Sequence, residues 1–318
     1  MSTAFVTGAS GFIGGTLTKR LVAEGWTVNA LARSEKSANA VRTLGATAVK
    51  GDLDDVAAMT AGAEGSDVAF HCAANLGEWG NPADFERVNV TGTANAVQAA
   101  KEAGVARFVH VGTEAALMHG EPLVNVDETV PLRPDSKALY SRTKARAEQV
   151  ARGGGAVVIR PRLVWGPGDA TILPALAEAV RRNRFAWIGR ATHRTSTTHV
   201  NNVVEGLMLG AQTGEPGEAY FVTDGEPQDF REFITRLLGT QGIEVPDKSV
   251  PRGVAGAITV AGEAAWRVLP LPGQPPLTRL AFWLASQECT IDITRARRDL
   301  GYSPVMSVDE GMKELQST

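Results

Sequence analysis

The sequence lacks the features that would assign it to several specialised classes of protein. It has only two cysteines, Cys72 and Cys289, so it carries no disulfide framework, and we expect it in a reducing compartment, the cytoplasm. Its 32 basic and 35 acidic residues nearly balance, which argues against nucleic acid or an anionic membrane surface as a partner. No uncharged apolar run reaches about 18 residues, so we expect no transmembrane helix. The first residues, MSTAFVTGAS, have neither the basic nor the long apolar region of a secretory signal, so we expect none.

Strand-like and helix-like segments alternate through the first half of the 318 residues. Short apolar runs, typical of strands covered on both faces, occur at 4–7, 27–31, 46–50, 68–71, 107–111 and 157–160. Apolar residues at helical spacing predict helices at 12–24, 36–44, 91–103 and 139–151. This alternation predicts an α/β fold, a Rossmann-type doubly wound parallel sheet built from right-handed βαβ units.

Beyond about residue 162 the pattern becomes irregular, and prolines and glycines are frequent. We therefore predict a dinucleotide-binding domain at 1–162, with its sheet completed by about 195–224. A smaller C-terminal substrate-binding lobe would comprise 163–194 and 225–318. Within this lobe, residues 254–283 are rich in apolar side chains. We interpret them as the core of the lobe or, alternatively, as an apolar lid over a lipid-like or steroid-like ketone.

Three glycines, Gly8, Gly11 and Gly14, lie between the first predicted strand and the first predicted helix. Glycine at these positions allows a tight turn and a close approach of the backbone to a pyrophosphate, which then lies at the positive end of the helix. The position at the start of a βαβ unit distinguishes the motif from an ordinary strand–helix connection. The sequence therefore predicts a site for a nicotinamide dinucleotide.

The residues after the second predicted strand indicate which dinucleotide is bound. The usual acidic residue, which holds the ribose 2′-hydroxyl, is missing, and Arg33 and Ser34 stand there instead. A guanidinium pairs with a 2′-phosphate, whereas a carboxylate would repel it. We therefore predict NADP(H). NAD(H) is the alternative, if Arg33 is a solvated loop residue or stacks on the adenine.

Tyr140 and Lys144 are four residues apart in a predicted helix, so both lie on one face of it. An adjacent ammonium and an oxidised nicotinamide favour the phenolate and lower the pKa of the tyrosine, which makes it an acid–base group. Thr113 follows the strand predicted at 107–111, at the sheet edge where ligands bind in such folds, and its hydroxyl can hold the substrate oxygen. We predict these three as the catalytic set; for the tyrosine–lysine pair alone, a surface contact of the helix is the alternative.

Taken together, these motifs resemble those of the extended short-chain dehydrogenases/reductases, the group of the sugar-nucleotide epimerases and the 3β-hydroxysteroid dehydrogenases. The resemblance covers essentially the whole chain and is carried by TGASGFIGG at 7–15, GDL at 51–53, HCAA at 71–74, Asn89, Thr113, YSRTK at 140–144, RPRLVWGPG at 160–168 and HVNNV at 199–203. With the arguments above, it implies a cofactor-binding set of Gly8, Ser10, Gly11, Phe12, Ile13, Gly14, Arg33, Ser34, Asp52, Leu53, Ala73, Ala74, Asn89, Tyr140, Lys144, Pro161, Leu163 and Val164. It also implies a homodimer through the helices at 91–103 and 139–151.

The resemblance is closest to the 3β-hydroxysteroid dehydrogenase branch, through residues 218–227. Thr113-Glu114-Ala115 departs from the Thr-Asp-Glu of the dehydratases. We expect reversible hydride transfer between NADP(H) and a secondary alcohol or ketone on a fairly hydrophobic small molecule. The alternatives are a nucleotide-sugar 4-epimerase or dehydratase with tightly bound NAD, and a non-catalytic dinucleotide-sensing protein. Four residues are predicted to contact the substrate: Trp79, Glu114, Trp165 and Arg194. The histidines show no metal-ligand spacing, so no metal is expected.

Overall fold

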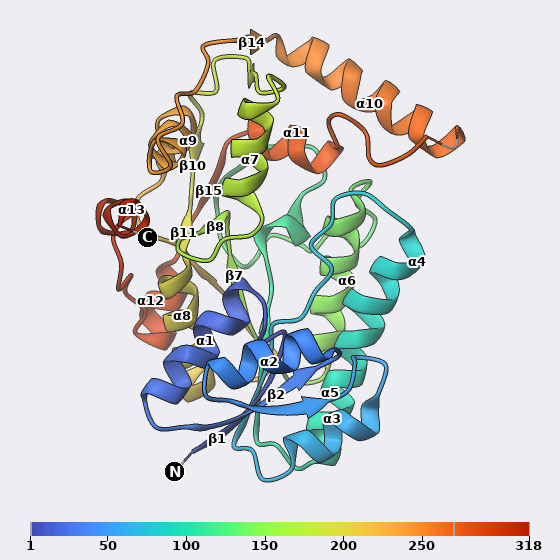
Figure 1. The fold of residues 1–318 in the computed structure, drawn as a ribbon, viewed down its shortest axis with the longest axis vertical. Helices are drawn as coiled ribbons and strands as arrows, with labels where there is room; N and C mark the ends of the chain where they lie inside the picture. The colour runs from blue at the N-terminus through green and yellow to red at the C-terminus, as the bar shows by residue number, and fades with distance from the viewer. Residues whose placement is uncertain (1, 270, 318) are drawn as a thin grey trace.

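A seven-stranded sheet forms the core of the N-terminal part of the molecule (Figure 1). The computed structural model describes residues 2–269 and 271–317. The strand order is β12-β7-β5-β4-β1-β2-β3, and every neighbouring pair is parallel. The strands are β1 (Thr3–Thr7), β2 (Thr27–Ala32), β3 (Thr47–Lys50), β4 (Val68–His71), β5 (Arg107–Val111), β7 (Val157–Pro161) and β12 (Ala219–Val222). This confirms the predicted Rossmann-type fold, and β12 lies within the segment predicted to complete the sheet.

Helices cover both faces of this sheet, so its central strands are buried, as their continuous apolar sequences predict. On one face α8 contacts both α1 and α12, and on the other α3 and α6 flank α5. The helices of this part are α1 (Phe12–Ala23), α2 (Glu35–Thr43), α3 (Val56–Ala63), α4 (Pro82–Phe85), α5 (Gly92–Glu102), α6 (Leu139–Gly153), α8 (Val200–Thr213) and α12 (Thr294–Leu300). A π-helical turn, η1 (Glu86–Thr91), leads into α5, and a 3₁₀ turn, η2 (Glu114–Leu117), follows β5.

The lobe lies beyond the carboxyl ends of the parallel strands (Figure 1). Its largest sheet has the order β13-β10-β15-β6, and two pairs, β8–β11 and β9–β14, complete it. Its strands are β6 (Leu123–Val126), β8 (Val164–Trp165), β9 (Trp187–Ile188), β10 (Arg194–Thr195), β11 (Thr198–His199), β13 (Gln228–Asp229), β14 (Ser249–Val250) and β15 (Cys289–Ile291). Its helices are α7 (Ile172–Arg181), α9 (Phe230–Gly239), α10 (Arg252–Val268), α11 (Arg279–Ser286) and α13 (Val308–Gln316). Because β6 pairs with β15, a segment inside 1–162 belongs to the sheet of the lobe.

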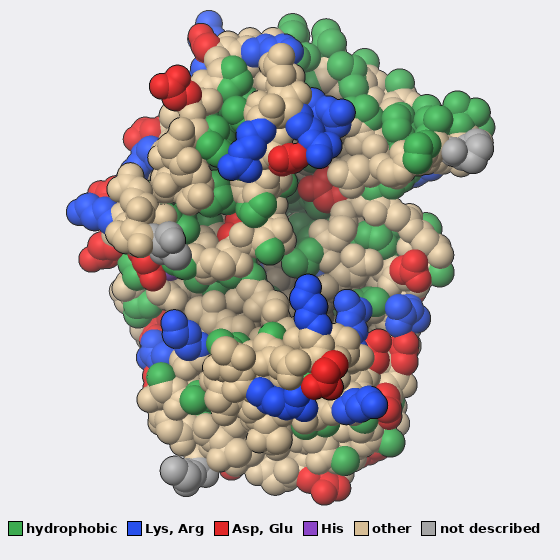
Figure 2. All heavy atoms as spheres, viewed as in Figure 1, with side chains coloured by type: hydrophobic (Ala, Val, Ile, Leu, Met, Phe, Trp, Pro, Cys, Tyr) green, Lys and Arg blue, Asp and Glu red, His purple; other side chains and the backbone are tan. Residues whose placement is uncertain are grey.

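The apolar segment 254–283 forms the core of the lobe only in part. Leu280 and Trp283 of α11 are buried in the main core. By contrast, α10 turns a long apolar face outward (Figure 2), with side chains such as Ile258 at 46% exposure. Its polar residues Thr259 and Glu263 are buried. Packing against α11 therefore places the polar stripe of α10 inside, against the expectation for a core helix. No helix within 2–269 or 271–317 has the length and apolar character needed to cross a membrane.

Candidate active site

The glycine turn between β1 and α1 is packed too tightly for side chains. Gly8 has φ +72°, a left-handed conformation that favours glycine, and a Cβ there would lie 2.6 Å from the backbone nitrogen of Ala73. A Cβ at Gly14 would overlap the carbonyl of Gly8 and lie 2.7 Å from its carbon. The turn and the start of α1 are therefore pressed against the residues that follow β4. This brings Ala73, predicted to line the cofactor site, beside Gly8.

The N-terminal end of α1 is open. Gly11 is its N-cap, and among the described residues no side chain caps it. The first N–H groups of a helix have no acceptor within the helix, and the aligned peptide dipoles make this end positive. Ser10 and Gly11 are exposed there, and Phe12 and Ile13 are partly buried. The glycine turn and the uncapped start of α1 together form a cradle that fits a pyrophosphate. Because the glycines have no side chains, the backbone around this cradle stays free for the phosphates.

A basic pocket lies where the ribose of the adenine half is predicted to bind. It has a volume of about 330 Å³ and is lined by Ala32, Arg33, Ser34, Glu35, Ala38, Arg42, Ala48 and Lys50. Glu35 is paired with Arg42 at 2.8 Å, so the one carboxylate of the pocket is partly neutralised. The Ser34 hydroxyl caps α2. Arg33 and Lys50 thus bring two exposed positive charges to one pocket, which Lys50 joins from the neighbouring strand.

Asp52, Leu53 and Asn89, all of the predicted cofactor set, make contacts within the protein itself. Asp52 accepts a hydrogen bond from the backbone of Leu53, whose side chain is buried. Asn89 is 1% exposed: its amide oxygen accepts from the Asn75 nitrogen, and its amide nitrogen donates to Asn75 O and Thr143 Oγ1. The direct contact between Asn89 and the cofactor stays a prediction. The side chain holds the loop after β4 against α6.

Thr113 and Tyr140 meet at the carboxyl end of β5. Thr113 caps η2, and its hydroxyl accepts from Ala115 N at 3.2 Å and donates to Glu114 Oε2 at 2.8 Å. Tyr140 lies in the first turn of α6. Burial and the charge of Glu114 raise the pKa of Tyr140 above its usual value, while a hydrogen bond with the Thr113 side chain acts against this. The structure thus brings two of the three predicted catalytic side chains into contact.

Lys144 lies one turn further along α6 and is almost completely buried. Its ammonium donates to Val111 O at 2.7 Å and lies 3.5 Å from His110 Nε2. Burial lowers the pKa of Lys144 to about 8, against the attraction of the Glu148 and Cys72 side chains. The same burial, with the charge of Lys144, holds the pKa of His110 well below its usual range, so the imidazole is neutral.

A Lys144→Met variant should be more stable than the parent protein. Below the folded pKa of about 8, lysine is charged in both states, and its buried charge lowers the free energy of unfolding by about 3 kcal/mol. Loss of the bond to Val111 offsets part of the gain, which leaves roughly 1–2 kcal/mol near pH 7. As pH rises through about 8 toward the unfolded pKa of about 10.4, the parent recovers and the difference shrinks.

Denaturant unfolding of the two proteins at several pH values, without cofactor, measures this difference. Lys137→Met is the matched control, because Lys137 is exposed just before α6 and its loss should change stability by less than about 0.5 kcal/mol. A Lys144→Met protein that is less stable at every pH would contradict the burial cost.

Two residues predicted to contact substrate do not face the site directly. Glu114 is 3% exposed and forms an ion pair with Arg162, so its link to the site runs through Thr113. Arg194 is exposed and donates to Pro227 O. It precedes Thr195 in β10, and successive side chains of a strand point to opposite faces. Since Thr195 bonds Arg162 behind the site, Arg194 points away from it.

The two tryptophans that were predicted to contact substrate differ in their surroundings. Trp165 is fully buried among Phe233 and His199, and its indole nitrogen donates to Asp224 at 2.8 Å, so it packs the lobe. The predicted contact of Trp165 with substrate stays a prediction. Trp79 is partly buried in the loop after β4, with the guanidinium of Arg267 5.6 Å from its ring centre. Its contact with substrate stays a prediction.

The segment after β7 closes the site on the lobe side. Pro161 is buried at the end of β7, while Leu163 and Val164 are partly exposed. Leu163 has φ +41°, a left-handed conformation that costs a residue with a Cβ about 1–2 kcal/mol. A strained backbone conformation of this kind persists only where the surrounding structure enforces it, and such places are often beside a ligand. Figure 2 shows a recess between the sheet and the lobe on this side of the molecule.

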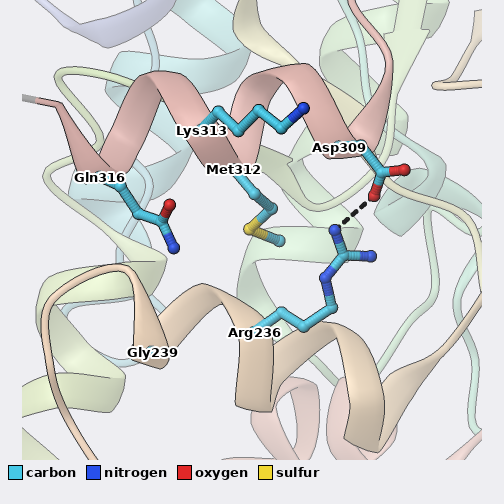
Figure 3. Close-up of a pocket in the computed structure, with 6 residues that line it drawn as sticks. All are labelled: Arg236, Gly239, Asp309, Met312, Lys313 and Gln316. Carbon is cyan, nitrogen blue, oxygen red and sulfur yellow. Dashed lines mark hydrogen bonds and ion pairs between the residues drawn. The ribbon is translucent and has the colours of Figure 1, made fainter.

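A second hollow lies elsewhere, between α9 and α13, and holds none of the predicted site residues. Its volume is about 380 Å³, and its lining consists of Arg236, Gly239, Asp309, Met312, Lys313 and Gln316 (Figure 3). An ion pair between Arg236 and Asp309 crosses it. In the part of the chain that the structure describes, no group of three or more His, Cys, Asp or Glu side chains is placed to hold a metal ion.

Sequence reasoning missed two residues that support the site. In the sequence, Arg162 is one residue of the motif at 160–168, and His110 is one residue of the strand predicted at 107–111. Neither position by itself indicates a role in the site. Each matters because of a contact with a residue more than 30 positions away, Glu114 for Arg162 and Lys144 for His110. A buried arginine needs an acidic partner. The chain has 35 acidic residues, and the sequence does not indicate that Glu114 is the partner of Arg162.

Comparison with known proteins agrees with the family resemblance and with the observed fold. The 3-beta hydroxysteroid dehydrogenase/isomerase family model matches residues 5–252. The chain is 44% identical to 4-hydroxy-2-methyl-3-oxo-4-farnesyl-3,4-dihydroquinoline-1-oxide ketoreductase of Stigmatella aurantiaca, over 98% of this chain and 95% of the relative. It is 35% identical to 2-alkyl-3-oxoalkanoate reductase of Stenotrophomonas maltophilia, over 98% of each. The UDP-glucuronic acid 4-epimerase from Bacillus cereus, solved with NAD, shares the fold: its TM-score is 0.74 at 19% identity, over 99% of each chain.

These findings confirm the predicted resemblance to the extended short-chain dehydrogenases/reductases, and with it an enzyme of the short-chain dehydrogenase/reductase class that acts on CH–OH groups. The chain belongs to the 3-beta hydroxysteroid dehydrogenase/isomerase family.

Proposed function

We propose that this protein reduces a ketone on a hydrophobic small molecule to a secondary alcohol, with NADPH as the hydride donor. The placement of Thr113 and Tyr140 together at the carboxyl end of β5 carries the proposal, because it puts a proton donor and a hydroxyl group on the sheet edge that also holds the glycine turn. The two relatives named above are reductases of substrates with a farnesyl or an alkyl chain. Their names support both the reaction and the apolar substrate.

Each side chain has a distinct part in this mechanism. When bound, the dinucleotide supplies the hydride. The open end of α1 and the glycines hold the pyrophosphate, and Lys144 holds the nearby ribose. Tyr140 donates the proton that the substrate oxygen takes up, and its raised pKa keeps that proton in place at neutral pH. Thr113 positions the substrate oxygen beside the phenol. Pro161 and Val164 exclude water on the lobe side.

A substrate screen tests this proposal against the nucleotide-sugar alternative. A reductase given a matching ketone consumes NADPH, so the near-ultraviolet absorbance of NADPH falls in proportion to the ketone added. An epimerase converts its nucleotide sugar with no net change in cofactor. Steady turnover of a nucleotide sugar without cofactor loss would refute the proposal; cofactor binding without turnover of any hydroxysteroid, ketone or nucleotide sugar would favour the sensor alternative.

The basic pocket supports NADPH over NADH. Replacing Arg33 with serine should weaken NADPH binding about 10- to 100-fold, because hydrogen bonds to charged groups contribute about 1.5–3 kcal/mol. Affinity for NADH, which lacks the 2′-phosphate, should stay within about twofold and serves as the control in the same variant. Fluorescence titration with both cofactors measures the two constants. An equal loss for NADH would mean that Arg33 stacks on the adenine.

Two further expectations belong to this proposal. The homodimer implied by the family resemblance would use α5 and α6, which contact each other along the face of the sheet away from α1. The cytoplasm remains the predicted compartment. Size measurement in solution and the location of the tagged protein in cells test these two expectations.

A further inference from the structure

The helix α10 turns an unbroken apolar face to solvent. Among the described residues, nine large apolar side chains are exposed, and six of these lie between 254 and 271. Single exposed apolar residues are ordinary, whereas a contiguous exposed patch marks a surface that binds something. Exposed residues recur every three or four positions along α10 and therefore line one side of it. This outer face consists of Val254, Ala257, Ile258, Ala261, Ala264 and Val268.

Polar contacts on the opposite side of α10 fix this orientation. Glu263 is 4% exposed and accepts hydrogen bonds from the backbone nitrogen and from Nε of Arg279, both at 2.8 Å. Thr259 is also buried and donates to Ala255 O within the helix. Turning the outer face inward would separate Glu263 from Arg279, which is costly for a buried pair. The folded lobe therefore holds α10 with its apolar side toward solvent.

Exposed arginines gather at the start of α10. The helix begins shortly after β14, which pairs with β9, and Gly189 N donates to Val250 O at 2.8 Å. The residues on either side of β9 therefore lie beside the start of α10. Three exposed arginines of this region form what we call the basic rim: Arg184, Arg190 and Arg252. Within 2–269 and 271–317, none of the three forms an ion pair.

The local charge around the basic rim is positive, although the whole chain is nearly neutral. The acids Glu178 and Asp247 in the neighbouring segments are each paired with an arginine outside the rim. Figure 2 shows hydrophobic side chains gathered over α10 and basic side chains close to them on the same view. The overall balance of charge, from which we expected no anionic membrane surface as a partner, averages over this local excess.

A lipid bilayer matches this surface better than a second protein does. Protein interfaces carry about one hydrogen bond per 100–200 Å², and the outer face has no polar side chain to make one. A second copy packed on this face would bring Arg252 and Arg267, near the two ends of α10, toward the same charges of its partner. Acyl chains need no polar partners, and anionic headgroups attract arginines.

We propose that α10 is a membrane-docking helix. Its outer face enters the boundary between the headgroups and the acyl chains of an anionic bilayer, and the basic rim binds the phosphates of the headgroups. The helix lies along the bilayer surface, because only one of its sides is apolar and exposed. The inference goes beyond the proposed function and does not depend on it, since neither substrate nor cofactor takes part.

Co-sedimentation with vesicles tests the inference without substrate or cofactor. Vesicles of phosphatidylcholine with about one-third phosphatidylglycerol should bind the full chain. Vesicles of phosphatidylcholine alone should bind it at least about tenfold more weakly, because each arginine near an anionic surface contributes roughly fivefold. Added salt should weaken the binding by screening. A protein that stays in the supernatant with the anionic vesicles, or binds both kinds equally, would overturn the inference.

Val254→Glu tests the outer face itself. It should weaken binding to the anionic vesicles by about tenfold or more, because it removes apolar contact and adds a negative charge. Val305→Glu is the matched control, since Val305 is 52% exposed and Val254 50%, but Val305 lies between α12 and α13. This control should bind within about twofold of the parent protein. An equal loss in both variants would show that net charge alone governs binding and would overturn the role of α10.

The oligomeric state separates a bilayer from a second copy as the occupant of the outer face. Size measurement without vesicles should give the same mass for the parent and for Val254→Glu, and both should unfold at the same temperature because Val254 is exposed. A larger parent that the substitution converts into a smaller species would show that a second copy covers this face. That result would overturn the inference.

Discussion

A Tyr140→Phe variant is expected to bind NADPH as tightly as the parent protein and to reduce ketones about 10²- to 10⁴-fold more slowly. The substitution keeps the ring and its packing in the first turn of α6, and it removes the hydroxyl that meets Thr113. The substrate oxygen then develops charge with no acid to neutralise it. Single-turnover oxidation of NADPH gives the rate, and fluorescence titration gives the affinity of the same sample.

Tyr220→Phe is the control for this experiment. Tyr220 is fully buried in β12, and its hydroxyl accepts a hydrogen bond from the Glu215 nitrogen at 3.1 Å. Losing that bond should cost about 1 kcal/mol of stability and leave the rate of reduction unchanged. Comparable rates for the parent and Tyr140→Phe would remove Tyr140 from the mechanism.

The second large effect is expected at the glycine turn. Gly14→Ala should weaken dinucleotide binding by about 100-fold or more and lower the free energy of unfolding by about 1–3 kcal/mol. Its φ is not in the left-handed region, so the effect comes from contact alone: the added Cβ would overlap the backbone carbonyl of Gly8. A backbone cannot yield like a flexible side chain, so the turn must open and the cradle for the pyrophosphate is lost.

Gly153→Ala separates this contact from a general effect of glycine in helices. Gly153 is the last residue of α6, and a Cβ there would meet no atom within 4 Å. Alanine should therefore be neutral or stabilise α6 by up to about 1 kcal/mol, with no change in cofactor affinity. Titration with NADPH and thermal unfolding of both variants measure the difference. Normal affinity in Gly14→Ala would contradict the role given to the turn.

Local sequence signals were sufficient for the parallel sheet and for the glycine turn. The predicted strands at 68–71 and 107–111 coincide with β4 and β5, because buried strands have continuous apolar sequences. The helix that holds Tyr140 and Lys144 was predicted for a similar reason, since apolar spacing along 139–151 is helical. These features depend on neighbours within a few residues.

Features that depend on distant partners could not be read from the sequence. The pairing of β6 with β15 joins residues more than 150 positions apart, and nothing in either segment indicates the other. Trp165 lies next to a predicted site segment, yet its indole bonds to Asp224, which comes just after β12. Glu114 directly follows Thr113, so a contact with substrate was a reasonable expectation. Its actual partner, Arg162, comes from a different strand end and was identified only in the structure.

The fate of the hydride tests the central claim most directly. NADPH that carries deuterium at the transferred position of the nicotinamide is incubated with a hydrophobic ketone, and the product is analysed by mass spectrometry and NMR. The account predicts one deuterium per molecule of product, on the carbon that bears the new hydroxyl, with one NADP⁺ formed for each. Product that forms without deuterium on that carbon, or with no net oxidation of the cofactor, would contradict it.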